Sequence, residues 1–308
     1  MERRMGTGLG RVVVAGGSGL VGRKLVRALL DRGAQVQVLT RNPATLHVPA
    51  GASAHGWEGL PGLLEGVDAV INLAGEGIAD RRWSSARKTA IRDSRTRTTA
   101  RLVEAMRGCG QPPKALVSAS AIGYYIPRDT RPVDEGTGPG SGFLAEVCRA
   151  WEGEAEAASA LGVRVALVRI GVVLDREGGA LPKMALPVRW CAGSKLGAGT
   201  QGLSWIHIDD LVAMLIEAAR NPAWSGAFNG TAPQPLSNEA FMQLIAQRLR
   251  RPLLPVPGFL TALATRLLLG EMAEALLLQG AFVLPARSQA LGFQFRFPTA
   301  KAALEDLL

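Results

Sequence analysis

Seven residues near the N-terminus constrain the fold of this chain more than any others: Gly16-Gly17-Ser18-Gly19-Leu20-Val21-Gly22. They stand between an apolar run at 12–15 and a stretch of helical periodicity at 20–30. A strand must turn sharply into a helix there, and glycine tolerates the backbone angles and lets a phosphate approach the main chain. The helix N-terminus offers unpaired N–H groups and a partial positive charge to a pyrophosphate. A glycine-rich turn can be only a turn, but in this context it predicts a dinucleotide-binding βαβ unit.

The next apolar segment indicates which dinucleotide this unit prefers. Residues 35–40 alternate as a strand should, and Thr40 and Arg41 follow each other at its end. An NAD site usually carries an acid at about this position to hold the ribose 2′-hydroxyl. A guanidinium instead suits a 2′-phosphate. The sequence therefore predicts NADP(H) rather than NAD(H), unless Arg41 is one more exposed cation of a basic protein.

Length and composition describe an ordinary globular protein. The chain has 308 residues, 47% of them hydrophobic and 20% charged, which suits one large or two unequal domains. The net charge of +9 is not accompanied by cations interleaved with aromatic residues, so nucleic acid is not expected as a partner. An anionic small molecule would explain part of the excess charge. The cysteines, Cys109, Cys148 and Cys191, have no C-x-x-C spacing, which indicates neither a disulfide framework nor a metal site.

No segment has the pattern of a targeting signal or a membrane span. Residues 1–10 carry two arginines without an apolar segment after them, unlike a secretory signal. The apolar stretch 259–284 is interrupted by Arg266, Glu271 and Glu274, which would lie within the bilayer. A cytoplasmic protein without membrane contact is expected.

Predicted strands and helices alternate over the first part of the chain. Strands are expected at 12–15, 35–40, 68–74, 114–121 and 164–173, helices at 84–107 and 143–161, and irregular structure up to Gly66. This alternation predicts an α/β protein with a Rossmann-like, doubly wound parallel sheet and a smaller mixed C-terminal lobe. We expect a dinucleotide-binding domain at 10–174, with the segment 203–230 returning to it, and a substrate or C-terminal lobe at 175–308.

Several fragments, in this order, resemble one family. They are the glycine motif at 16–22, Asn72-Leu-Ala-Gly75, Val117-Ser-Ala-Ser120 and Trp205-Ile-His-Ile-Asp-Asp210. Together they resemble the extended short-chain dehydrogenase/reductases, the superfamily of sugar-nucleotide epimerases and dehydratases. The C-terminal fragments Arg266-Leu-Leu-Leu-Gly-Glu-Met272, Val283-Leu-Pro285 and Gly292-Phe-Gln-Phe-Arg-Phe-Pro298 resemble an atypical branch known as epimerase family proteins.

The resemblance implies a set of cofactor-binding residues. They are Gly16, Gly19, Leu20, Val21 and Gly22 at the phosphate turn, Thr40 and Arg41 at the adenosine ribose, Leu73, Ala74 and Gly75 along the cofactor, and Arg95 on the long helix. Arg95 stands where family members often have asparagine. It either faces the cofactor phosphates or is a solvated helix arginine.

The catalytic pattern of the superfamily is incomplete in this chain. The resemblance implies a Ser or Thr after the fifth strand and Tyr-x-x-x-Lys on the next helix, where the tyrosine exchanges a proton with the substrate. Ser120 matches the hydroxyl residue, but Phe143 and Val147 stand at the tyrosine and lysine positions. Tyr124, four residues after Ser120, is the candidate for a displaced acid, and Glu135 or Arg149 could assist it.

Three functional readings follow from this departure. The first is an NADP(H)-dependent reductase or epimerase acting on a carbonyl or hydroxyl group of a small polar substrate, with Ser120 and Tyr124 as catalytic residues. The second is a non-catalytic NADP(H)-binding sensor or interaction protein. The third is an isomerase with bound cofactor that uses Ser120 alone.

Candidate substrate-binding residues lie in the glycine-rich loop around 193–202 and after it. Lys195 and Gln201 could receive an anionic substrate, although the loop could also be a plain connection. His207 belongs to the segment that organises the substrate lobe in the enzymes this chain resembles. Such a histidine is either catalytic or a hydrogen-bonded structural residue.

Overall fold

The computed structural model describes residues 8–126 and 129–308, so the first seven residues, where no secretory signal is expected, lie outside it. Within the described residues, seven parallel strands form the main sheet in the order β3-β2-β1-β4-β5-β6-β10. The strands are β1 (Arg11–Ala15), β2 (Gln35–Leu39), β3 (Ala52–His55), β4 (Ala69–Asn72), β5 (Ala115–Ala121), β6 (Arg164–Ile170) and β10 (Gly226–Gly230). The order reverses at β1, as in a doubly wound sheet. The predicted α/β fold class is confirmed.

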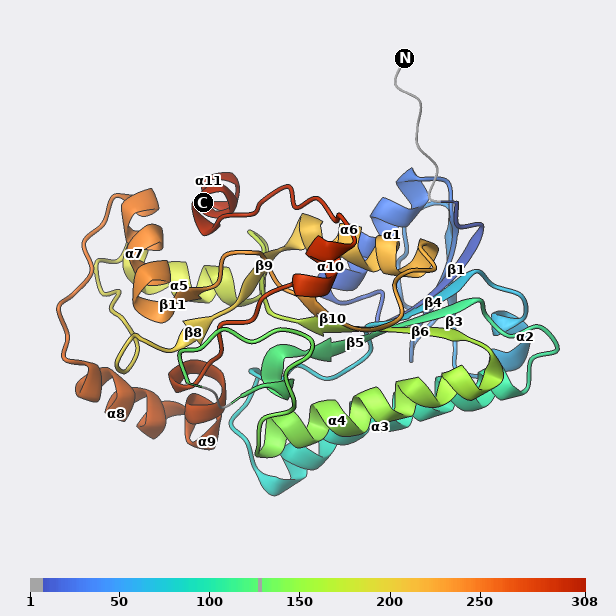
Figure 1. The fold of residues 1–308 in the computed structure, drawn as a ribbon, viewed down its shortest axis with the longest axis horizontal. Coiled ribbons are helices and arrows are strands. Elements are labelled where there is room, and N and C mark those ends of the chain that lie inside the picture. Colours follow the sequence, from blue (N-terminus) through green and yellow to red (C-terminus); the bar gives the residue numbers. More distant parts are fainter. Residues whose placement is uncertain (1–7, 127–128) are drawn as a thin grey trace, which may run out of the picture.

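Helices cover both faces of this sheet (Figure 1). The main helices are α1 (Leu20–Asp31), α2 (Leu60–Leu64), α3 (Ser85–Arg107), α4 (Phe143–Glu156) and α6 (Ile208–Arg220). Val12 and Val14 of β1 pack in one core with α1 and α6, whereas Val13 and Ala15 pack in the other with α2 and α3. Successive side chains of a strand point to opposite faces, which is why an uninterrupted apolar strand fills two cores.

The region up to Gly66 departs from the sequence prediction. It was expected to be irregular because of its glycines and prolines, but it contains β3 and the short helix α2. The sequence of β3, Ala-Ser-Ala-His, has none of the large apolar residues that mark a buried strand. It lies at the edge of the sheet, paired on one side with β2, and so needs little apolar surface.

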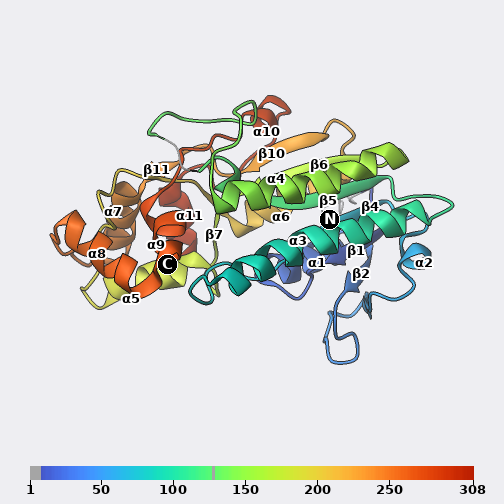
Figure 2. The same ribbon diagram turned by 90° about the horizontal axis from the view of Figure 1, so that it is seen from below.

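The C-terminal part forms a smaller lobe with its own apolar core (Figures 1 and 2). Its elements are β7 (Val172–Leu174), α5 (Ala180–Arg189), β8 (Gly202–Leu203), β9 (Trp205–His207), β11 (Leu236–Ser237), α7 (Asn238–Leu249), α8 (Gly258–Leu269), α9 (Glu271–Ala273) and α11 (Ala300–Leu307). Helix α10 (Ala286–Ala290) instead packs against β10 of the main sheet. Short helices of other geometry are η1 (Ile122–Tyr124) after β5, η2 (Ala157–Leu161) after α4 and η3 (Glu274–Leu278) after α9. The smaller lobe therefore combines helices with two small sheets, β7-β9 and β11-β8.

The chain returns to the main sheet after entering the smaller lobe. Helix α6 packs in the same core as α1, and β10 pairs in parallel with β6. Across residues 8–126 and 129–308, no helix combines the length and apolar content needed to cross a membrane.

Candidate functional site

The glycine turn has the geometry of a phosphate cradle. Gly16 has φ +82°, a conformation that glycine adopts without strain, and the Gly19 N–H donates to the Gly16 carbonyl at 3.1 Å. A Cβ on Gly22 would collide with that carbonyl oxygen. Helix α1 begins at Leu20, with Val21 in its first turn, and none of the side chains that the structure describes caps its N-terminus. The first amides of α1 are therefore available to a pyrophosphate, so the turn fits a dinucleotide.

Thr40 and Arg41 lie at the same edge of the sheet as this turn. Strands β1 and β2 pair in register from Arg11 with Gln35 to Ala15 with Leu39, so their carboxyl ends lie side by side. The Thr40 hydroxyl accepts from the Asn42 N–H at 3.2 Å. The exposed Arg41 side chain makes no ion pair or hydrogen bond with other described residues, which leaves its guanidinium available to a ligand.

The turn after β4 lies directly against the glycine turn. A Cβ on Gly16 would lie 2.7 Å from the Leu73 carbonyl oxygen, so residue 16 must be glycine for the two turns to approach. Buried Asn72 shapes this second turn, because its Oδ1 accepts from the Ala74 N–H at 3.2 Å. Its Nδ2 donates to Thr99 Oγ1 of α3 at 2.9 Å, which fixes residues 73–75 relative to the helix layer.

Thr99 joins this turn to α4 as well. Its hydroxyl oxygen also accepts from Trp151 Nε1 at 3.0 Å and donates to the Arg95 carbonyl at 2.8 Å. A serine or threonine hydroxyl has one donor and two acceptor lone pairs, so all its hydrogen bonds are used. The loop that would border the cofactor is thereby tied to both α3 and α4.

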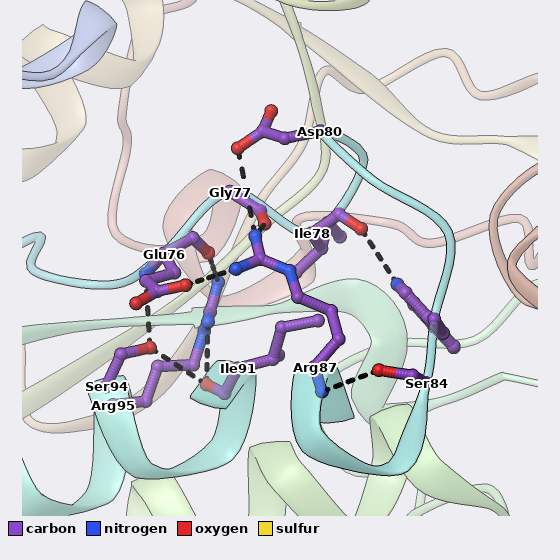
Figure 3. A network of polar contacts seen from close by, with 10 residues as sticks. Glu76, Gly77, Ile78, Asp80, Ser84, Arg87, Ile91, Ser94 and Arg95 are labelled. Atoms are coloured by element: carbon purple, nitrogen blue, oxygen red, sulfur yellow. Dashed lines mark hydrogen bonds and ion pairs between the residues drawn. The ribbon is translucent and has the colours of Figure 1, made fainter. Parts of the chain in front are cut away.

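Two arginines of α3 hold the loop that follows Gly75 (Figure 3). Arg95 donates to the Ile91 carbonyl at 2.9 Å and to the Glu76 carbonyl at 3.0 Å, and a Cβ on Gly75 would lie 3.2 Å from its Cζ. Arg87 pairs with the Glu76 carboxylate. Burial lowers the pKa of Arg95. Arg95 is therefore half-buried against the loop rather than a solvated helix residue.

Ser120 belongs to a buried polar network. Its hydroxyl donates to Glu152 Oε1 at 2.6 Å, and only 2% of the residue is exposed. Arg169 of β6 donates two hydrogen bonds of 2.8 Å to the same carboxylate, from Nε to Oε1 and from Nη2 to Oε2. Burial alone would lower the pKa of Arg169, but the hydrogen bonds and the charge of Glu152 raise it. The pair is a bidentate, charged hydrogen-bonded unit.

The two tyrosines meet Arg169 in different ways. Tyr125 is fully buried, accepts from Arg169 Nη1 at 2.8 Å and donates to Asn229 Oδ1 at 2.9 Å. Burial raises the pKa of Tyr125 to about 12. The Tyr124 ring instead lies flat against the guanidinium, whose Cζ is 3.5 Å from the ring centroid. Among the described residues the half-buried Tyr124 hydroxyl has no hydrogen-bond partner, so it is the phenol free to meet a ligand.

The residues at the expected tyrosine and lysine positions cannot exchange protons. Phe143 is the first residue of α4, with its ring edge-on to Trp83 at 5.1 Å between centroids. Lys88 Nζ lies 5.2 Å from the centroid of the Phe143 ring and pairs with Glu271 at 2.6 Å. Val147 is buried. Nearby Cys148 is no substitute nucleophile, since burial raises the pKa of its thiol to about 11.

The expected substrate residues make internal contacts in the smaller lobe. Lys195 Nζ pairs with Glu239 at 3.1 Å, and Gln201 Nε2 donates to the Leu196 and Leu277 carbonyls at 3.0 and 2.9 Å. The Leu196 amide donates to Asn238 Oδ1 at 2.9 Å. An anion at this loop would have to displace these partners, and the substrate role of Lys195 and Gln201 stays a prediction.

His207 also makes local contacts with both ring nitrogens. Nδ1 accepts from the Asp209 N–H at 3.1 Å and caps α6, and Nε2 lies 3.3 Å from Asp306 Oδ2 of α11. Its ring stacks on Phe297 at 3.8 Å, and burial lowers the pKa of the imidazole. The residue joins α6 to the C-terminal helix, and its predicted substrate role stays a prediction.

The sequence analysis did not identify the two charged residues of the buried network, Glu152 and Arg169. Glu152 and Arg169 lie in apolar surroundings within an amphipathic helix and a core strand. Buried charges are rare unless they are paired, so Arg169 in the strand sequence Arg-Val-Ala-Leu-Val-Arg-Ile was a signal for a buried partner. The spacing of residues in the sequence did not indicate that this partner is Glu152.

Fold and site together define a nucleotide-binding member of a known enzyme family. Residues 12–229 match the NAD dependent epimerase/dehydratase family, and residues 260–307 match a domain of unknown function. The chain belongs to the NAD dependent epimerase/dehydratase family. The predicted resemblance to an atypical epimerase branch is confirmed.

Two related proteins and one solved structure are similar to this chain over nearly its whole length. The chain is 41% identical to the chloroplastic epimerase family protein SDR39U1 homolog of Arabidopsis thaliana, over 96% of this chain and 86% of the relative. It is 38% identical to an epimerase family protein of Staphylococcus saprophyticus, over 96% and 98% of the two chains. A crystal structure of human epimerase family protein SDR39U1 with NADPH superposes with a TM-score of 0.85 at 34% identity, covering 96% and 98%.

Proposed function

We propose that this chain binds NADP(H) and reduces, or epimerises through a carbonyl, a small polar substrate. The observation that carries the cofactor proposal is the open N-terminus of α1 at the glycine turn. Arg41, whose guanidinium has no partner among the described residues, follows the neighbouring strand β2 at the same edge of the sheet. Gly19 and Gly22 allow the close approach of a pyrophosphate, and Arg41 supplies a bidentate donor for a 2′-phosphate. The similar human protein crystallised with NADPH supports this choice.

In the proposed reduction the bound NADPH supplies hydride, and Tyr124 supplies the proton to the carbonyl oxygen. A phenol that carries its proton is a poor base but a usable acid. The guanidinium of Arg169 against the Tyr124 ring favours the negative charge that develops on the phenol when its proton leaves. The Ser120 hydroxyl already donates its hydrogen bond to Glu152, so we assign it the role of positioning the Glu152–Arg169 pair that supports Tyr124.

A second candidate is NADP(H) binding without turnover, as a sensor or interaction protein. Phe143 and Val147, in place of a tyrosine and a lysine, favour it. The two candidates share the cofactor site and differ in whether Tyr124 donates a proton to a substrate.

A screen of small polar carbonyl compounds, including anionic ones, by nicotinamide absorbance distinguishes the two candidates, with Tyr124→Phe as the discriminating variant. Turnover that Tyr124→Phe leaves unchanged contradicts the proposed acid, and absence of turnover across the screen favours the binding protein.

Calorimetric titration with NADPH and NADH tests the cofactor. We expect NADPH to bind more tightly, and Arg41→Ser to weaken NADPH binding by roughly 10- to 150-fold, the value of one charged hydrogen bond of about 1.5–3 kcal/mol. NADH binding should not change. Arg251→Ser, at another exposed arginine far along the chain, is the matched control. Equal affinity for both cofactors would contradict the role of Arg41.

A further inference from the structure

The start of helix α3 carries a cation that the proposed reaction does not use. Lys88 Nζ lies 2.6 Å from Glu271 Oε1 of α9 and 5.2 Å from the centroid of the Phe143 ring. Figures 1 and 2 both place α9 beside the ends at which α3 and α4 begin. This one lysine therefore meets a carboxylate of the smaller lobe and the aromatic residue that stands at the expected tyrosine position.

The surroundings of this lysine extend to the turn that carries Tyr124, the proposed acid. A Cβ on Gly123 would lie 3.1 Å from Leu144 Cβ, so η1 packs against the first turn of α4. Tyr124 is the last residue of η1, and Phe143 is the first residue of α4. Phe143 thereby connects the ammonium of Lys88 to the turn that holds Tyr124.

The carboxylate that meets this lysine belongs to an arm, residues 258–280, that is fixed at both ends. At each end two backbones cross with no room for a Cβ: Gly258 against Gly197, and Gly280 against Gly202. The glycine-rich loop around 193–202, which was expected to bind substrate, therefore anchors the arm. The tip of the arm meets α3 through the side chain of Glu271, which can change rotamer while the anchors stay in place.

Positive charge exceeds negative charge where the tip of the arm meets α3. Arg87, next to Lys88 in the helix, is already neutralised by Glu76 (Figure 3). Arg82 is exposed and makes no ion pair or hydrogen bond with the other described residues. A Cβ on Gly270 would lie 3.3 Å from Arg82 Nη2, so this guanidinium lies beside the tip of the arm. Two cations thus face one carboxylate, and such an excess attracts a further anion.

We propose that Lys88 binds the anionic group of the substrate, and that Glu271 occupies this position when no substrate is bound. The inference rests on the proposed function and names its substrate class, a small carbonyl compound that carries a carboxylate. The side chains of Lys88 and Glu271 are 30% and 54% exposed, and an ion pair this exposed is weak enough to be exchanged for a carboxylate from solution. A compound held by Lys88 through its carboxylate has its carbonyl group free to meet Tyr124.

Calorimetric titration of malonate into the full chain, with and without NADPH, tests the anion site without turnover. The wild-type protein should bind malonate, and Lys88→Met should weaken this binding at least about 10-fold, the loss of one charged hydrogen bond. Glu271→Gln should strengthen it about 2- to 5-fold, because the internal carboxylate no longer competes. An ion pair that only joined the two lobes would give no such gain.

Lys183→Met is the matched control for the titration. Lys183 is an exposed lysine of α5 without an ion pair among the described residues, so this variant should bind malonate as the wild-type protein does. A protein that binds NADPH but not malonate overturns the inference and leaves the cofactor proposal intact. A Glu271→Gln protein that binds malonate no more tightly than the wild type overturns it as well. Inorganic phosphate that binds more tightly than malonate overturns the carboxylate class.

The screen for NADPH oxidation tests the same residue during turnover, with each oxo acid paired with its amide. Lys88→Met should raise KM for the acids at least about 10-fold and leave KM for the amides unchanged. Lys88→Arg keeps the positive charge and should restore part of the preference for acids. Equal kcat/KM for acids and amides in the wild-type protein would overturn the proposed role of Lys88, even though turnover itself would support the reductase.

Discussion

Gly22→Ala is the sharpest test of the phosphate cradle, because it adds one methyl group where backbone already lies. The Cβ of an alanine at position 22 would lie 2.7 Å from Gly17 Cα, and closer still to the Gly16 carbonyl oxygen. Carbon atoms in favourable contact are about 3.5–4.0 Å apart, so the turn must open by about 1 Å. Overpacking of this kind costs about 1–3 kcal/mol of folding free energy, and more where only backbone can yield.

The same displacement moves the amides that would hold a pyrophosphate. Losing one charged hydrogen bond there weakens NADPH binding by roughly 10- to 150-fold. Gly153→Ala is the matched control, since Gly153 is exposed within α4 and a Cβ at this position would have no neighbour within 4 Å among the described residues. Alanine is favoured over glycine in a helix by up to about 1 kcal/mol, so Gly153→Ala should be slightly stabilising and leave binding unchanged.

Urea unfolding and calorimetric titration of both variants give the result. Gly22→Ala should lose stability and NADPH affinity together, and Gly153→Ala should lose neither. A Gly22→Ala protein with wild-type stability and wild-type affinity for NADPH would refute the close approach of the turn and α1.

Three further outcomes follow from the buried contacts. Arg169→Met leaves the Glu152 carboxylate buried without its cation and should cost about 3–5 kcal/mol in urea unfolding, with part regained in Glu152→Gln/Arg169→Met; a loss below about 1 kcal/mol contradicts this. Thr99→Val leaves the buried donors of Asn72 and Trp151 unpaired, so we expect a loss of about 2–5 kcal/mol by the same assay, against little change for exposed Thr89→Val. Because burial lowers the folded-state pKa of His207, the contribution of this residue to stability is complete above about pH 6.5 and is lost as the pH falls below it. His207→Asn keeps a capping acceptor and should make the thermal midpoint less dependent on pH between about pH 7 and 5. A variant with the same pH dependence as the wild-type protein would contradict this assignment.

The parts of the fold that the sequence predicted are those in which local pattern and tertiary environment agree. Ser84 was the expected start of the long helix, and its side chain does accept from the Arg87 amide at the start of α3. The glycine turn predicted the strand before it and the helix after it, because glycines are needed for the sharp turn that joins them. Strand β3 escaped prediction because an edge strand needs neither length nor large apolar residues.

The candidate site was only partly readable for a different reason. Gly16 and Gly22 are required by backbone contacts that any chain with this turn must make. The buried partners depend instead on how α4 packs against β5 and β6. This packing brings Glu152 to Ser120, 32 positions away, and to Arg169, 17 positions away. Sequence spacing indicates such pairs within one helix or hairpin, but not between elements that meet only in the folded protein.

The route of the chain through β10 has a consequence for synthesis. Strand β6 is complete at Ile170, but its neighbour β10 begins at Gly226, after β7, α5, β8, β9 and α6. During synthesis, β6 therefore remains an unpaired edge strand until residue 230 has left the ribosome. Until then Tyr125 also lacks its hydrogen-bond acceptor, Asn229. Folding of the nucleotide-binding part cannot finish as an N-terminal unit. Its last strand must wait for the segment inserted before it, and an unpaired edge is open to wrong pairing during that interval.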